Sequence, residues 1–110
     1  MAHETAALVK PVSIMLDKER HLKITLGGMK KFQEKTGKNL LKGFNIADMD
    51  AGDLAAFVWS CLIWEDPELT LEKCEFMLDF ARLTEISNKL AEALNISLPE
   101  QKGDAGANPQ

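Results

Sequence analysis

The sequence predicts an α+β domain that is mostly helical, with an N-terminal two-stranded antiparallel hairpin packed on about four helices. Two observations lead to this fold class. Apolar and polar residues alternate between Val12 and Leu26, which is the pattern of strands with one buried face. From Met29 onward, apolar residues recur at helical spacing, and Gly37 and Pro67 interrupt the pattern.

Length and composition predict one core. Of the 110 residues, 45% are hydrophobic and 27% are charged, which is typical of a small globular domain. We expect a domain over residues 12–98, a flexible N-terminus over 1–11 and a flexible C-terminal tail over 99–110. The net charge of -4 argues against general nucleic-acid binding.

The hairpin is expected to turn at Lys18, Glu19 and Arg20. A lone hairpin is marginal in water, so its second strand should lay its apolar face on the helices. The residues of that face are Leu22, Ile24 and Leu26.

A helix from about Met29 to Thr36 follows Gly27 and Gly28, with Met29 and Phe32 facing inward and Gly37 closing it. A short helical turn over residues 39–44 comes next. It is expected to carry Leu40, Leu41 and Phe44 to the core.

The run from Leu54 to Trp64 has no charged residue and predicts a central helix, for which Asp50 is a suitable N-cap. It is apolar nearly all round, and Trp59 and Ile63 point away from its main face. That second face must be covered, either by another element of the chain or by a partner.

Pro67 is expected to end the central helix, and Thr70 opens the next one. Thr84 is expected to cap a last helix. The apolar stripe of the helix after Thr70 comprises Leu71, Cys74, Met77, Leu78 and Ala81, and it is widened by Phe76 and Phe80. The last helix is expected to bury Ile86, Leu90, Ala93 and Leu94.

The surplus of apolar helix surface favours a protein interface. The candidate contacts are Trp59, Ile63, Phe76 and Phe80, and self-association through the same residues to form a homo-oligomer is an open alternative. A membrane span is excluded, because it needs about 20 apolar residues and the run stops at Asp53 and Glu65. No signal-peptide core precedes it, so a cytoplasmic location is expected.

No catalytic, cofactor or metal site is predicted, and an enzyme is not expected. The aspartates from Asp48 to Asp53 resemble a calcium loop, but Trp59 stands where the bidentate Glu belongs, so capping explains them better. His3 and His21 have no nearby partner in the sequence. The two cysteines, Cys61 and Cys74, are expected to be buried free thiols.

The helix before Gly37 carries several lysines, and Lys30, Lys31 and Lys35 form a candidate basic patch. Lys38 and Lys42 follow beyond Gly37. Charge runs usually mark a solvated helix face. The alternative is a small nucleic-acid-binding or regulatory domain, for which replacing Lys31 and Lys35 by Glu would abolish salt-sensitive DNA binding.

Three segments carry a resemblance to a known family: "LGGMKKFQEKTGKNLL" after the hairpin, "WEDPELTLEK" after the central helix, and the terminal "ISNKLAEALN". Their order resembles the small tail assembly chaperones of long-tailed phages, prophages and gene-transfer agents, over most of Ser13 to Asn95. The shared features are Leu22 to Leu26, Phe32 with Glu34, Gly37 with Asn39 and Leu40, and Asp66 to Thr70.

The resemblance implies a non-enzymatic protein that binds the tape-measure protein, and tail-tube subunits as a second client, before the tail polymerises. Such a protein would act in the bacterial cytoplasm and be absent from the mature virion. A structural subunit that stays in the tail is the alternative, and mass spectrometry of purified particles separates the two.

Overall fold

The computed structural model describes residues 11–42 and 46–97. In these ranges the predicted α+β class is confirmed, since a single antiparallel hairpin lies against helices. The strands are β1 (Val12–Met15) and β2 (Glu19–Leu22), the α-helices are α2 (Leu26–Thr36), α3 (Ala51–Leu62), α4 (Leu71–Met77) and α5 (Leu83–Ser97), and the 3₁₀ helices are η1 (Leu40–Lys42), η2 (Ile46–Asp48) and η3 (Phe80–Arg82).

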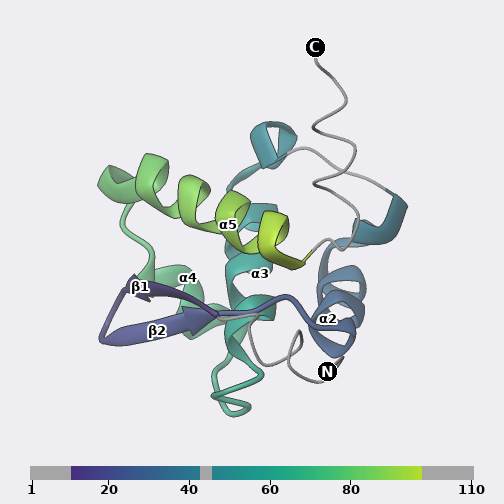
Figure 1. Cartoon of the computed structure of the whole chain (residues 1–110), viewed down its shortest axis with the longest axis horizontal. Helices are drawn as coiled ribbons and strands as arrows, with labels where there is room; N and C mark the ends of the chain where they lie inside the picture. Colours follow the sequence, from purple (N-terminus) through teal and green to yellow (C-terminus); the bar gives the residue numbers. More distant parts are fainter. Residues whose placement is uncertain (1–10, 43–45, 98–110) are drawn as a thin grey trace, which may run out of the picture.

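Helix α3 lies in the middle of the molecule, and α2, α4 and β2 all pack on it (Figure 1). Helix α5 crosses the molecule and contacts both strands of the hairpin. The core forms where these elements meet. Phe32 of α2 and Phe57 of α3 are completely buried there, with their ring centroids 5.7 Å apart. Each such side chain contributes roughly 1.5–3 kcal/mol through burial.

The second strand lies earlier in the chain than predicted. Strand β2 ends at Leu22, which pairs with Val12, and the turn falls on residues 16–18. The predicted strand from Leu22 to Leu26 is wrong because the Thr25 hydroxyl accepts a hydrogen bond from the Gly28 amide and starts α2 there. Leu26 is consequently 77% exposed, although Leu22 is buried.

Helix α2 begins three residues before the predicted Met29, so Gly27 and Gly28 lie in its first turn. A Cβ atom at Gly28 would collide with the carbonyl oxygen of Ser60, so this glycine lets α2 approach the backbone of α3. Gly37 closes the helix at φ 79°, as predicted. Phe32 faces inward as expected, and Met29 is half-buried against the core.

The connection after α2 is partly described. Leu40 in η1 is buried, as expected for the short helical turn. The side chain of Leu41 and all of Phe44 lie outside the described residues, so their predicted inward positions stay predictions.

Helix α3 begins as predicted, with an Asp50 carboxylate oxygen 2.8 Å from the Asp53 amide. It ends at Leu62, well before Pro67. The Leu62 carbonyl accepts hydrogen bonds from the amides of Glu65 and Asp66, which converts the end of the predicted helix into a turn. The expected end at Pro67 is therefore wrong.

Thr70 caps α4 as predicted, but the helix does not reach Ala81. It stops at Met77 because Leu78 is extended and Asp79 caps η3 through the Ala81 amide. The predicted continuous stripe is therefore wrong, and Phe76 and Phe80 belong to different elements.

Thr84 does not cap the last helix, because α5 follows η3 directly from Leu83. The predicted seam of α5 is confirmed for Ile86, Leu90 and Ala93, which are buried, and Leu94 is half-buried.

Candidate interaction surface

Phe76 and Phe80 are the most exposed aromatic side chains of the described residues, at 84% and 83%. Phe76 lies near the end of α4, and Phe80 begins η3. The break at Leu78 separates the two elements, so no helix of the described chain covers these rings. Burial of these two rings in a partner would recover the free energy that their exposure forgoes, which makes them candidate contacts.

Phe80 lies at an apolar groove of about 480 Å³ between the start of α3, the end of α4, η3 and the start of α5. This volume is within the range of about 300–1,000 Å³ that is typical of binding pockets. Its apolar walls are Met49, Leu54, Ala55, Leu78, Leu83 and Ile86.

Acidic residues stand around this groove. Asp50, Glu75 and Asp79 line it, and no described lining residue is Lys, Arg or His. Two of these carboxylates are fixed by capping bonds, since Asp50 accepts a hydrogen bond from the Asp53 amide and Asp79 accepts one from the Ala81 amide. The groove therefore combines apolar walls with a negative rim.

Trp59 and Ile63 lie elsewhere. Trp59 is only 7% exposed, and its indole nitrogen donates a 2.9 Å hydrogen bond to the Leu69 carbonyl. The Lys35 ammonium lies 5.8 Å from the centre of its ring. Ile63 is half-buried and packs against the core. The second face of α3 is thus covered by this chain, and only Phe76 and Phe80 of the four candidate residues are on the surface.

The lysines of α2 are exposed but have local carboxylate and aromatic neighbours. Lys31 lies 3.8 Å from Glu34, and Lys38 beyond the helix lies 3.5 Å from Asp53. Lys30 and Lys35 are also exposed, and Lys35 faces the Trp59 ring. This arrangement matches the solvated face that charge runs usually form, with part of the positive charge offset nearby.

The hairpin contains a buried cation that the sequence patterns did not indicate. Arg20 is 3% exposed and donates two 2.8 Å hydrogen bonds to Asp17 and one to Asp66. Hydrogen bonding from Arg20 lowers the pKa of Asp17 to about 2 and also lowers the pKa of Asp66. The cluster joins the hairpin to the turn after α3, which is a structural role.

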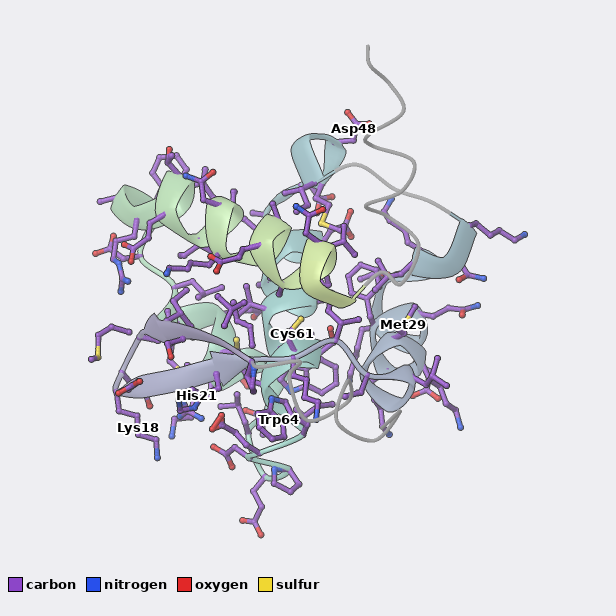
Figure 2. The ribbon with its side chains drawn as sticks, viewed as in Figure 1. Lys18, His21, Met29, Asp48, Cys61 and Trp64 are labelled. Atoms are coloured by element: carbon purple, nitrogen blue, oxygen red, sulfur yellow. The ribbon has the colours of Figure 1, made fainter. Side chains whose placement is uncertain are left out.

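A second polar contact joins the same elements. His21 Nδ1 lies 3.1 Å from the Glu65 carboxylate, and the Trp64 indole nitrogen donates to the His21 carbonyl (Figure 2). The hydrogen bond with Glu65 raises the pKa of His21, and the Glu19 charge adds to the effect. Among the described residues, the side-chain hydrogen-bond partners of this histidine are the Glu65 carboxylate and the Trp64 indole, and none is a hydroxyl or thiol.

Both cysteines are buried and free, as predicted. Burial raises the pKa of Cys61 and of Cys74 to about 12, which suppresses the reactive thiolate. Within residues 11–42 and 46–97, no cluster of His, Cys, Asp and Glu has the arrangement to hold a metal ion. His3 lies outside the described residues.

Comparisons with family models, with curated proteins and with solved structures give no match. None of the helices in the described part of the chain has both the length and the apolar content to cross a membrane. The features that bear on the class of protein are therefore the exposed phenylalanines, the groove and the pattern of the sequence.

Proposed function

We propose that this chain is a tail assembly chaperone of a long-tailed phage, prophage or gene-transfer agent, and that it binds the tape-measure protein before the tail tube polymerises. The observation that carries the proposal is the exposed ring of Phe80 at the apolar groove, together with a second exposed ring, Phe76, on helix α4, whose Glu75 lines the groove. The order of the sequence segments, which resembles that family, supplies the identity of the client.

The physical role is to cover apolar surface temporarily. A long tape-measure helix exposes apolar stripes before assembly, and such stripes aggregate unless they are covered. A groove on a small helical protein accepts one stripe by the helix-in-groove mode. Tail-tube subunits are a second client by the same logic, and the protein acts in the bacterial cytoplasm.

The chemistry of the described residues fits a binding protein better than an enzyme. Among the described residues, the histidine His21 contacts carboxylates, and both thiols are buried with a raised pKa. The lysines of the alternative basic patch, Lys30, Lys31 and Lys35, lie on α2 and not at the groove. A DNA-binding function would require that patch and would leave the exposed phenylalanines unexplained.

The test is to co-express the chain with the tape-measure protein encoded near it and to measure the soluble, co-purifying fraction of the latter. The wild-type chain should keep the tape-measure protein soluble, and the double change Phe76→Ser with Phe80→Ser should remove most of that effect. Leu26→Ser is the matched control, because Leu26 is also 77% exposed but does not line the groove.

Two results would overturn the proposal: a tape-measure protein that stays insoluble with the wild-type chain, or the presence of this chain in purified particles. Mass spectrometry of the particles gives the second result, since a chaperone leaves before assembly is complete and a structural subunit remains.

A further inference from the structure

We propose that the groove beside Phe80 selects an amphipathic helix whose apolar stripe is flanked by Lys or Arg. This rests on the proposed function for the natural source of the helix, a client protein. The proposal itself concerns the chemistry of the groove and the class of segment that it takes.

The shape and lining of the groove suit an amphipathic helix. It opens between four elements, and apolar wall is supplied by Leu54 of α3, by the extended Leu78 between α4 and η3, and by Leu83 of α5. Phe80 stands at its edge with a ring that is 83% exposed. A partner with a row of apolar side chains would bury that ring and fill the groove, which is the helix-in-groove arrangement.

The negative charge at the rim of the groove favours a partner with basic residues. Asp50, Glu75 and Asp79 line the groove without a lining cation, in a protein whose net charge is -4. Glu75 has no ion-pair partner among the described residues, so its charge is available to a ligand. Complementary potentials across an interface steer association and disfavour partners of like charge. Cations beside the apolar stripe therefore suit this rim, and carboxylates do not.

A second copy of this chain fits the groove poorly. With Lys30, Lys31 and Lys35, α2 carries more basic residues than any other described helix, so it is the part of a second copy whose charge would suit the rim best. Of the large apolar side chains on α2, however, only Leu26 is exposed. One side chain at the end of a helix does not provide the repeated apolar anchors that a groove binds.

The experiment measures fluorescence anisotropy of two labelled synthetic helical peptides with the purified full chain. Both peptides carry the same leucine stripe, one flanked by lysines and the other by glutamates. The lysine peptide should bind about tenfold more tightly at low salt, since several exposed charge pairs each contribute modestly. The difference should shrink as the ionic strength rises from about 0.05 to 0.5 M.

Two variants assign the effect to the groove. Glu75→Lys should remove the preference for the lysine peptide, whereas Glu72→Lys, the same charge change on an exposed residue of α4 that does not line the groove, should preserve most of it. Ala51→Trp should weaken both peptides, because Ala51 is exposed at the groove and a larger side chain would fill it. Circular dichroism checks that each variant is folded.

Equal affinity for the two peptides would overturn the proposal, as would equal effects of Glu75→Lys and Glu72→Lys. A concentration-dependent mass of the free protein that Ala51→Trp lowers would make a second copy the occupant, and would also overturn it. If the tape-measure protein is kept soluble equally by wild type, Glu75→Lys and Ala51→Trp, this inference fails while the proposed function stands. If the lysine peptide binds in the groove and the tape-measure protein does not bind, the function fails alone.

Discussion

The second face of α3 and the segment from α4 to η3 both carry aromatic residues in apolar patterns, yet their exposure is opposite. Trp59 on α3 is 7% exposed, whereas Phe76 on α4 is 84% exposed. The difference comes from the neighbouring elements. Helix α2 has 11 residues and packs along α3, while α4 has 7 residues and ends where Leu78 becomes extended. Exposure is decided by what covers a helix, and its own hydrophobicity is a weak guide.

The largest effect is expected at the covered face. Trp59→Ala should lower the free energy of unfolding by about 3–5 kcal/mol, because it removes a large buried ring and leaves a cavity. It also leaves the Leu69 carbonyl without its indole donor. Urea denaturation followed by circular dichroism measures the change. A loss below about 1 kcal/mol would mean that the Trp59 side chain is not buried in the core.

The packing of α2 against α3 is tested at two adjacent glycines, Gly27 and Gly28. Gly28→Ala should cost about 1–3 kcal/mol, because the new Cβ meets the Ser60 carbonyl and forces α2 away from α3. Gly27→Ala is the matched control, since no atom lies within 4 Å of its added Cβ, and it should stabilise by up to about 1 kcal/mol. The same denaturation assay compares them, and equal effects of the two changes would contradict the close approach.

These glycines also show where sequence patterns stop being sufficient. Asp50, Thr70 and Gly37 were predicted correctly as helix ends, because capping depends on residues that are adjacent in the chain. Thr25 caps a helix too, but the alternation of Leu22, Ile24 and Leu26 continued past it and favoured a longer strand.

The candidate surface was only partly predictable, because the exposure of its residues depends on elements that lie far away in the sequence. Helical spacing placed Trp59 opposite the main face of α3, but it cannot say which distant element covers that side. Phe76 and Phe80 were assigned to one stripe, although an extended Leu78 separates them. The apolar groove beside Phe80 is formed by residues between Met49 and Ile86, so it exists only after the chain has folded.

The exposed residues Phe76 and Phe80 should tolerate substitution without loss of stability. Phe76→Ser and Phe80→Ser should each alter the free energy of unfolding by less than about 0.5 kcal/mol, because neither side chain packs in the core. Thermal unfolding measures this, and the same proteins serve in the tape-measure assay. A loss of several kcal/mol would show that these rings are covered in solution, which would remove the contrast with Trp59.

The smallest effect is expected around Trp64. This side chain is 39% exposed but hydrogen-bonded, so its exposure is intermediate between those of Trp59 and Phe76. Its indole nitrogen donates to the His21 carbonyl, and the Lys23 ammonium lies 5.0 Å from its ring. The His21 side chain contacts Glu65, which raises the pKa of His21 above its ordinary 6.5. Protonated His21 therefore stabilises the fold fully below pH 6.5, and the contribution is lost as the pH rises through the raised pKa.

The variant His21→Gln isolates this contribution. It should remove the decline in the free energy of unfolding above pH 6.5 but keep Trp64 in place, since the anchor is the backbone carbonyl of residue 21 and not its side chain. Denaturation at a series of pH values measures the first. The other tryptophan, Trp59, is buried and hydrogen-bonded to the Leu69 carbonyl, so a change in native-state tryptophan fluorescence reports on Trp64. Identical pH profiles for the two proteins would show that the pair with Glu65 is too screened to matter. A fluorescence shift in the variant would instead show that the anchoring depends on the imidazole, and that exposure alone does not distinguish Trp64 from Phe76.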